Sequence, residues 1–272
     1  MDYDPIKDRL GTLFTRTVAG QRLFYRLLDA VFLRSWYVRR EIERIVGSQT
    51  KERPLQVLDA GTGFGQYAYH MAKTYPLAVI DAVDVKDDYL DNARRFIVRT
   101  PYAERVQFRK ADLTQLDAEG AYDLILAVDV MEHIEEDERV LARFSRALRP
   151  GGHVIINTPS DLGGSDAKVD GEPGFIGEHV REGYNRVELE EKLRRAGLQP
   201  VRTLYTYGSA GSAAWRLLVK YPMKMLGVSN AALFVLPIYY LPVFPIGMVL
   251  HALDLRVRHS RGTGLIAVAS KQ

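Results

Sequence analysis

The middle of the chain alternates short apolar runs with amphipathic stretches. Apolar runs of strand length occupy 55–61, 77–85, 105–113, 122–130, 151–159, about 200–207 and 264–270. Stretches with helical spacing lie at 87–97 and at about 137–148. Strands that are apolar on both faces and alternate with helices are typical of a parallel sheet covered on both sides. The pattern therefore predicts an α/β fold with an open, mostly parallel sheet.

The first strand runs into "DAGTGFG", in which Gly61, Gly63 and Gly65 are spaced as GxGxG. Glycine lets the backbone turn tightly and lets a ligand approach the main chain. A dinucleotide-binding turn would carry glycine at the position of Gln66, and the carboxylate of Asp59 would repel a pyrophosphate. The turn therefore argues against NAD and favours a ligand that presents a cation.

The next three strands also end in polar residues, and ligands of such sheets bind beyond the carboxyl ends of the strands. Asp84 ends the second strand, nineteen residues past Gly65, where a carboxylate accepts hydrogen bonds from ribose hydroxyls. Asp112 follows the third strand, where it is positioned to receive an exocyclic amine. The fourth strand ends in "VDVMEHI", which brings Asp129, Glu132 and His133 to the same edge.

The segments "VLDAGTGFG", "AVDV", "ADL" and "DVMEHI", in this order and spacing, resemble the class I S-adenosylmethionine-dependent methyltransferases. Within that class they resemble the ubiquinone-biosynthesis group. The resemblance covers about 55–207 and the final strand at 264–271. It implies a Rossmann-like, seven-stranded, mostly parallel sheet with helices on both faces, whose last strand is inserted antiparallel.

The resemblance also implies S-adenosylmethionine as the cofactor. Asp59 and the glycine turn would hold its amino-acid part, Asp84 its ribose, and Asp112 with Leu113 its adenine. The residues expected to bind the cofactor are Asp59, Ala60, Gly61, Gly63, Gly65, Asp84, Val85, Asp112, Leu113 and Asp129.

The methyl group on a sulfonium is already activated, so the protein mainly has to align the acceptor and exclude water. A hydroxyl acceptor would need a general base, and histidine is the usual one near neutral pH. His133 is the first candidate and His179 the second. The alternatives are that His133 only shapes the pocket or caps the next helix, and that His179 lies in solvent. The chain has no cysteine and no HExxH motif, so we expect no metal site.

Charge is distributed unevenly along the chain. Residues 1–53 carry eleven Lys and Arg against seven Asp and Glu, residues 54–207 carry nineteen against twenty-six, and residues 208–272 carry seven against one. Basic ends around an acidic middle suggest an anionic partner, either nucleic acid or a membrane surface. The N-terminus "MDYDPIKDRL" lacks the apolar core of a signal peptide, so we expect a cytoplasmic protein, peripheral on the inner membrane face.

An apolar insertion separates the sixth and seventh strands, and positions 225–250 carry no charged side chain. Its length would suffice for a membrane span. Pro237, Pro242 and Pro245 tend to break a helix, however, and both ends must return to adjacent strands. We therefore expect a segment that dips into a membrane face and comes back. Aromatic and basic residues at 212–226, with Arg256, Arg258 and Arg261, have the composition of an interfacial anchor.

The N-terminal region has helical spacing with interleaved arginines, as in Leu23, Phe24, Leu27 and Leu28. Such helices would cover the cofactor site, contact the membrane, or do both. Tyr25, Trp36 and Tyr37 are candidates for aromatic walls of the acceptor pocket. The expected organisation is a helical cap at 1–53, a methyltransferase domain at 54–207 with 263–272, and the insertion at 208–262.

The sequence thus favours a methyltransferase that acts on a lipophilic small molecule or a lipid, such as a quinone or polyketide-like phenol, a lipid headgroup or an isoprenoid or fatty product. A nucleic-acid methyltransferase is an alternative, weakened because the basic residues alternate with large apolar ones and no NPPY-type motif occurs. A non-catalytic membrane-associated binding protein is another. The acceptor atom (O, N or C) stays open, and the apolar insertion would equally suit a homodimer interface.

Overall fold

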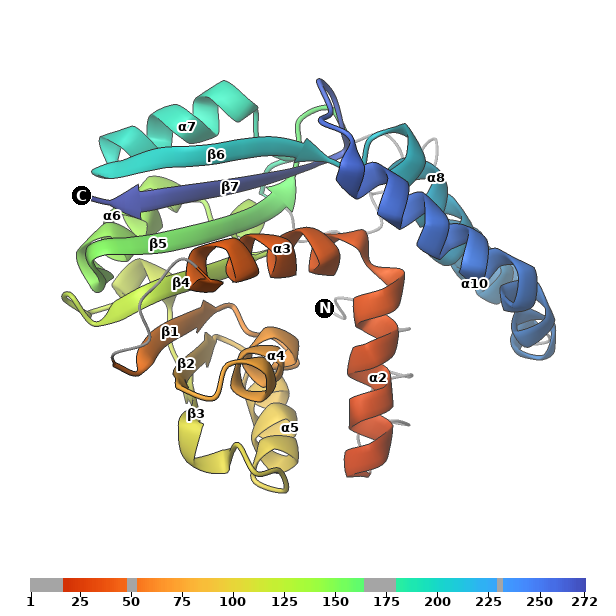
Figure 1. Ribbon diagram of the computed structural model, residues 1–272, viewed down its shortest axis with the longest axis horizontal. Helices are drawn as coiled ribbons and strands as arrows, with labels where there is room; N and C mark the ends of the chain where they lie inside the picture. Colours follow the sequence, from red (N-terminus) through yellow and green to blue (C-terminus); the bar gives the residue numbers. More distant parts are fainter. Residues whose placement is uncertain (1–16, 48–52, 164–179, 229–231) are drawn as a thin grey trace.

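The computed structural model describes residues 17–47, 53–163, 180–228 and 232–272 of the 272-residue chain. Candidate His179 lies outside these ranges. Seven strands form one sheet in the order β3-β2-β1-β4-β5-β7-β6, and β7 runs antiparallel to both its neighbours (Figure 1). The strands are β1 (Leu55–Ala60), β2 (Ala78–Asp84), β3 (Val106–Lys110), β4 (Tyr122–Val128), β5 (Leu148–Pro159), β6 (Leu198–Thr206) and β7 (Gly264–Lys271). The predicted Rossmann-like, mostly parallel sheet is confirmed.

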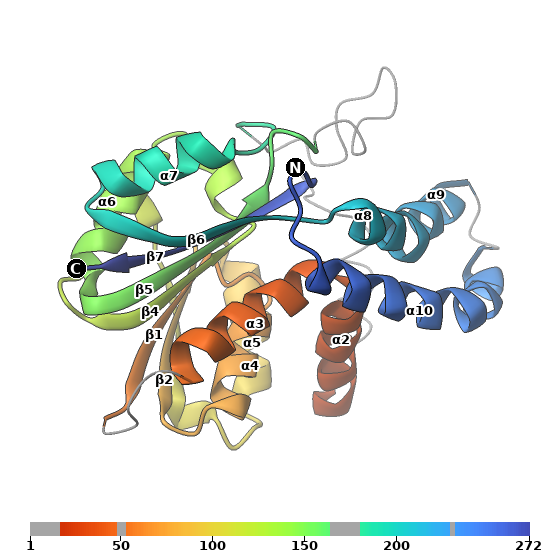
Figure 2. The same cartoon turned by 45° about the horizontal axis from the view of Figure 1, so that its top comes forward.

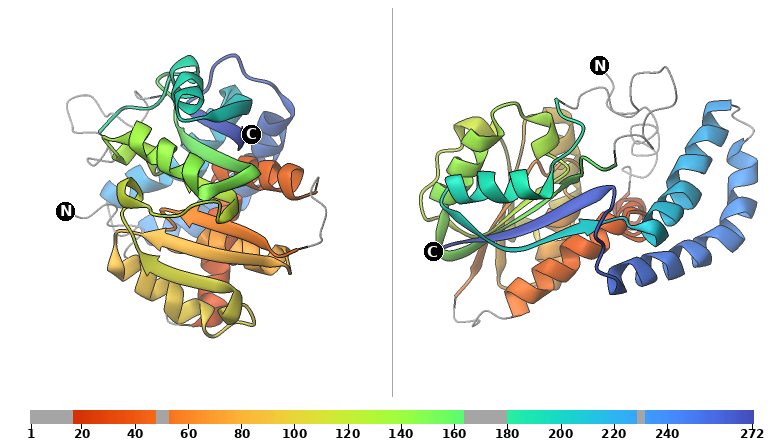
Figure 3. Two further views of the ribbon diagram at one scale, coloured as in Figure 1. Left: turned by 90° about the vertical axis from the view of Figure 1, so that its left-hand side faces the viewer. Right: turned by 90° about the horizontal axis from the view of Figure 1, so that it is seen from above.

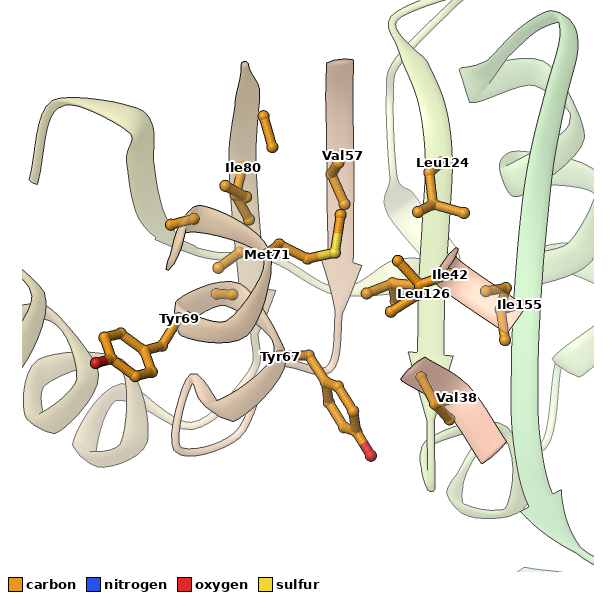
Figure 4. Packing of buried hydrophobic residues seen from close by; sticks show 14 of the residues in the cluster. Val38, Ile42, Val57, Tyr67, Tyr69, Met71, Ile80, Leu124, Leu126 and Ile155 are labelled. Carbon is orange, nitrogen blue, oxygen red and sulfur yellow. The ribbon is translucent and has the colours of Figure 1, made fainter. Parts of the chain in front are cut away.

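Helices cover both faces of the sheet (Figure 2). Neighbouring strand residues point to opposite faces, so Val57 packs in one apolar cluster and Leu58 in the other. Figure 4 shows the first cluster, where Met71 and Ile42 approach the sheet from two helices. The helices on this face are α3 (Leu33–Gly47), α4 (Gln66–Thr74) and α5 (Asp87–Ile97), and those on the other are α6 (Asp137–Ala147) and α7 (Arg186–Arg195).

Helix α2 (Val18–Val31) precedes α3 and stands away from the sheet (Figure 1). Its first turn is capped by Thr17, whose Oγ1 accepts a hydrogen bond from the Gly20 amide at 3.0 Å. Phe32 has extended backbone angles and separates the two helices. One face of α2 buries Phe24, whereas the adjacent Leu23 is 47% exposed. The N-terminal helices therefore present apolar surface to solvent as well as to the core.

The structure revises the role expected for the N-terminal aromatic residues. Tyr25 and Tyr37 are buried in the main apolar cluster, with only 2% and 1% of each residue exposed. The Tyr25 hydroxyl donates to the Phe64 carbonyl oxygen, and the Tyr37 hydroxyl donates to Asp254. Trp36 is half-buried, with its ring 5.5 Å from that of His251. These aromatic side chains hold the N-terminal helices and the insertion on the methyltransferase domain. Helical spacing in the sequence does not distinguish this role from lining a pocket.

The insertion between β6 and β7 forms a helical hairpin that projects beyond the sheet (Figure 2 and Figure 3, right). Its first leg comprises α8 (Ser209–Trp215), a π-helical segment η4 (Arg216–Lys220) and α9 (Tyr221–Val228), and its second leg is α10 (Ala232–Arg256). Among the described residues, one helix is long and apolar enough to cross a membrane, at Phe234–Arg256 with a mean hydropathy of 1.6. Only 11% of that window is buried, so α10 is not a core helix.

The expected helix break in this insertion was wrong, because α10 continues through Pro237, Pro242 and Pro245. Each proline removes a single donor, and packing against the first leg supports the helix on that side. Hydroxyls of Tyr239 and Tyr240 donate to backbone carbonyl oxygens in η4, at 2.9 and 2.7 Å. The return of the chain, which the sequence predicted, is made by the hairpin as a whole.

The base of the hairpin is fixed by Asp254, whose side chain is completely buried. The Tyr37 hydroxyl donates to Asp254 Oδ1 at 2.7 Å, and the Gly211 amide donates to Oδ2 at 2.8 Å. His259 Nε2 lies 3.2 Å from the same Oδ2. A buried carboxylate with these partners joins α3, α8 and the end of α10, so the hairpin is tied to the domain.

Candidate functional site

The glycine turn joins the end of β1 to the start of α4. The amides of Gly61 and Thr62 donate to the Val83 carbonyl oxygen at 2.8 and 2.9 Å, which ties the turn to β2. Gly61 has φ 73°, and a Cβ there would lie 2.2 Å from the Val130 side chain. Gly63 has φ 52°, and a Cβ there would meet nothing within 4 Å. Gly61 is thus required by packing, whereas the backbone at Gly63 is open to a ligand.

Asp59 supports this turn from inside the protein. Its side chain is 2% exposed, and Oδ2 accepts hydrogen bonds from Thr62 Oγ1 at 2.6 Å and from the Ala68 amide at 3.1 Å. Burial raises the pKa of Asp59 to about 6. Its neighbour Ala60 is fully buried, so only the Ala60 backbone is available to a ligand. Asp59 therefore holds the turn and the first turn of α4 together, a role that the sequence did not predict.

Asp84 ends β2 next to the same turn. Its Oδ2 accepts from the Gly63 amide and its Oδ1 from the Lys86 amide, both at 2.9 Å. The side chain is partly exposed, and each carboxylate oxygen can accept more than one hydrogen bond. Val85, which follows, is 56% exposed. The geometry leaves Asp84 able to accept from hydroxyl groups while its orientation is fixed by the backbone.

Asp112 follows β3 and caps a short helix, η2 (Leu113–Gln115). Its Oδ1 accepts from the Thr114 amide and hydroxyl at 2.9 and 2.8 Å, and these bonds lower the pKa of Asp112 below its usual value. The residue is exposed, whereas Leu113 is buried. Since β3, β2 and β1 are neighbours in the sheet, the three carboxylates at their ends lie along one edge.

Asp129 follows β4 in a left-handed backbone conformation with φ 54°, which is rare for a residue other than glycine. Asn157 holds it from β5, with the Asp129 amide donating to the Asn157 carbonyl at 2.8 Å and Asn157 Nδ2 donating to Asp129 Oδ1 at 2.9 Å. Arg34 Nη1 in α3 lies 3.0 Å from Asp129 Oδ2. Nothing in the sequence distinguishes Arg34 from the other arginines spaced along the N-terminal helices.

Glu132 and His133 lie in the short helix η3 (Met131–His133) that follows. Glu132 is 1% exposed, and its Oε2 accepts from Thr158 Oγ1 at 3.2 Å. Burial and the charge of Asp129 raise the pKa of Glu132 well above its usual range. Glu132 thus lies near Asp129 at the end of β4, as expected, but its carboxylate is buried. His133 is half-buried.

A metal centre has no support in the described ranges, where no group of three or more His, Asp and Glu is arranged to hold an ion. Glu132 and Asp129 are held by Thr158, Asn157 and Arg34, as described above.

Comparison with known proteins assigns part of the chain to a protein family. Residues 57–152 match the family model described as "Methyltransferase domain". These residues include the glycine turn and the ends of β1 to β4. This part of the chain is a methyltransferase domain. The predicted resemblance to S-adenosylmethionine-dependent methyltransferases is thereby confirmed for this domain.

Curated relatives of the methyltransferase domain act on different molecules, to judge by their names. A trans-aconitate 2-methyltransferase from Methylobacterium nodulans is 30% identical over 170 residues, covering 58% of this chain and 64% of the relative. A 27-O-demethylrifamycin SV methyltransferase from Amycolatopsis mediterranei is 26% identical over 167 residues, covering 59% and 60%. This chain therefore spans less than two thirds of the length of these relatives.

A solved structure shares the fold of the methyltransferase domain. The phosphoethanolamine N-methyltransferase 2 of Haemonchus contortus, in complex with S-adenosyl-L-methionine, superposes with a TM-score of 0.65 at 18% identity. The match covers 100% of this chain and 60% of that one. At this identity the likeness shows the fold alone.

Proposed function

We propose that this protein is an S-adenosylmethionine-dependent methyltransferase that transfers a methyl group to a lipophilic small molecule or a lipid at a membrane surface. The domain assignment supports methyl transfer. The observation that carries the choice of acceptor is the exposed apolar face of α10. The proposed location is the cytoplasm, in peripheral contact with the inner face of the membrane.

The apolar face of α10 runs along its whole length. Phe234 is 84% exposed and Leu241 is 76% exposed. The large apolar side chains exposed on this helix are Phe234, Val235, Ile238, Leu241, Ile246, Val249 and Leu253. Contiguous apolar surface of this kind marks a membrane, a ligand or a protein partner.

Basic residues around the hairpin favour the membrane. Arg216, Lys220 and Lys224 lie on its first leg, and Arg256 ends α10. A basic side chain near an anionic membrane surface contributes about 1 kcal/mol of binding free energy. Helix α2, which contacts α10, adds exposed leucines beside exposed arginines at 22–27. An apolar stripe with a basic border is the composition of an interfacial anchor.

The residues at the edge of the sheet fit the cofactor that the domain implies. S-adenosylmethionine supplies a methyl group activated by its sulfonium. Asp84 is oriented to accept from ribose hydroxyls, and Asp112 and Leu113 provide a carboxylate and an apolar surface for adenine. The open backbone at Gly63 and the carboxylate of Asp59 would receive the amino-acid part.

Asp129, which is also proposed to contact the cofactor, lies just after β4, and His133 follows in η3. Arg34 and Asn157 hold Asp129, so its carboxylate keeps a fixed direction. His133 is the proposed base for an acceptor hydroxyl, and His179 is the second proposed base.

A label-partition assay tests this proposal. The protein is incubated with S-adenosylmethionine carrying a labelled methyl group and with membranes or total RNA, and the products are separated into organic, aqueous and nucleic-acid fractions. We expect label in the organic extract of the membranes, and less of it when the apolar face of α10 is made polar. Label in RNA would favour a nucleic-acid methyltransferase. Cofactor binding without transfer to any fraction would favour a non-catalytic binding protein.

A further inference from the structure

A second polar site lies at the base of the hairpin. A pocket of about 160 Å³ opens between α3, β6 and the residues that follow α10, in the region where Figure 1 shows these elements meeting. Five of its eleven lining residues are arginines, namely Arg40, Arg44, Arg202, Arg256 and Arg258. None of the eleven belongs to the glycine turn or to the ends of β1 to β4.

Positive charge in this pocket exceeds the negative charge beside it. One buried carboxylate, that of Glu41, serves three of the arginines. Its oxygens lie 2.5 Å from Arg44, 3.2 Å from Arg202 and 3.8 Å from Arg40. In the part of the chain that the structure describes, Arg256 and Arg258 make no ion pair. Several guanidinium groups are therefore available to an anion.

The excess positive charge affects Arg40 most directly. Burial and the charge of Arg44 lower the pKa of Arg40 below its usual value. Its Nη1 donates to the Leu255 carbonyl at 2.6 Å, whereas its buried Nε has no hydrogen-bond partner in the described ranges. A buried cationic donor without an acceptor costs free energy, which a bound anion would offset.

We propose that this pocket binds a phosphate group, and that the headgroup of an anionic lipid supplies it. Guanidinium groups bind phosphate oxygens in a bidentate manner, which is why arginine is preferred at such sites. The volume of about 160 Å³ lies below the roughly 300–1,000 Å³ of pockets that enclose whole small-molecule ligands. It suits a headgroup phosphate and is too small to enclose a whole nucleotide.

The position of the pocket favours a lipid headgroup as the source of the phosphate. The exposed side chains of α10 follow one stripe from Phe234 to Leu253, and the next exposed positions are Arg256 and Val257. A lipid surface against that stripe would reach the pocket at its end. This inference rests on the membrane contact proposed above and is independent of methyl transfer.

The test compares two double variants that remove the same charge. Arg256→Gln/Arg258→Gln removes two arginines from the pocket wall, and Lys73→Gln/Arg99→Gln removes two exposed basic residues that lie outside both the hairpin and the pocket. Each protein is sedimented with vesicles of phosphatidylcholine, with and without phosphatidylglycerol. We expect the pocket variant to lose affinity for the anionic vesicles by about 30-fold, as for two basic side chains at a membrane surface, and the control by about threefold or less. Equal losses in both variants would overturn the proposal.

Inorganic phosphate distinguishes the two sources of the anion. Added to the wild-type protein, it should compete with the anionic vesicles and lower binding to the level of the pocket variant. Phosphate binding that depends on Arg256 and Arg258, together with equal affinity for both kinds of vesicle, would overturn the lipid source. Calorimetry with S-adenosylmethionine separates the two proposals, because the pocket variant should bind it as the wild type does. If the wild-type protein prefers anionic vesicles but transfers no methyl group, only the proposed function is contradicted.

Discussion

Arg34 in α3 forms an ion pair with Asp129 at the end of β4, with 3.0 Å between Nη1 and Oδ2. The pair connects the N-terminal helices to the edge of the sheet where the candidate site lies. Asp129 has a left-handed backbone, a conformation that costs about 1–3 kcal/mol and persists only where neighbouring groups hold it. Arg34 and Asn157 are those groups, so the cap completes the site.

The first prediction concerns this ion pair. Arg34→Gln should lower turnover about tenfold, because Asp129 loses the partner that orients its carboxylate. The side chains are 22% and 30% exposed, so the free energy of unfolding should fall by only about 1 kcal/mol. Steady-state kinetics and thermal unfolding measure the two effects. The matched control is Arg53→Gln, which breaks an ion pair with Asp123 outside the site; equal loss of turnover in both variants would contradict the role of Arg34.

A second prediction follows from the buried carboxylate of Asp59. Its pKa is about 6 in the folded protein and 3.8 ordinarily, so the stability it contributes is present below pH 3.8 and is lost as the pH rises through 6. Asp59→Asn keeps an acceptor oxygen and removes this dependence. Between about pH 3 and pH 7 the free energy of unfolding of the variant should rise by about 3 kcal/mol relative to the wild type. Chemical denaturation at several pH values measures it, and a constant difference would contradict the prediction.

The same residue gives a test of contact with the cofactor. A bound ammonium group would favour the charged form of Asp59. Affinity for S-adenosylmethionine should then increase as the pH rises through about 6 in the wild type, and this increase should be absent in Asp59→Asn. Identical pH profiles would show that Asp59 supports the turn without reaching the ligand.

A fourth prediction concerns the apolar face of α10. The triple variant Phe234→Ser/Ile238→Ser/Leu241→Ser should bind vesicles about 1,000-fold more weakly or worse, because each large apolar side chain contributes about 1.5–3 kcal/mol when fully buried. Its thermal stability should not change, since these side chains are exposed in the folded protein. The control replaces Val98, Val187 and Val201, which are 60%, 61% and 56% exposed on other elements. Vesicle binding that survives in the triple variant would exclude the hairpin as the anchor.

The fifth prediction concerns the proposed role of His133 as a general base. If it acts as the base, His133→Ala should slow turnover by about 100-fold or more and change cofactor affinity by less than about twofold. His153→Ala, in β5, serves as the control. A parallel decrease in turnover and affinity would assign His133 to the wall of the pocket.

The fold was predictable because the strands are short apolar runs, and glycine or aspartate stands at or within two residues of the ends of β1 to β4. Burial on both faces requires Val57 and Leu58 to be apolar alike, and this leaves a signal in the sequence. The carboxylates of Asp84 and Asp112 were also predictable, since the carboxyl ends of parallel strands meet at one edge.

The contacts between distant segments were not predictable from the sequence. Asp254 appears there as a lone acid in a basic region, and only the folded chain shows it bound to Tyr37, 217 residues away. The five arginines of the pocket come from three separate segments. Helix α10 is continuous because it packs against the first leg of the hairpin. The local preference of proline against helices carries no information about that packing.

The central claim is that carboxylates along the edge of the sheet hold S-adenosylmethionine, and calorimetry with Asp84 variants tests it most directly. We predict that the wild type binds S-adenosylmethionine and S-adenosylhomocysteine, that Asp84→Asn weakens binding about tenfold, and that Asp84→Ala abolishes it. Asp87→Ala, which removes an exposed carboxylate paired with Lys110, should bind as the wild type does. Unchanged affinity in Asp84→Ala, or no binding by the wild type, would contradict the account.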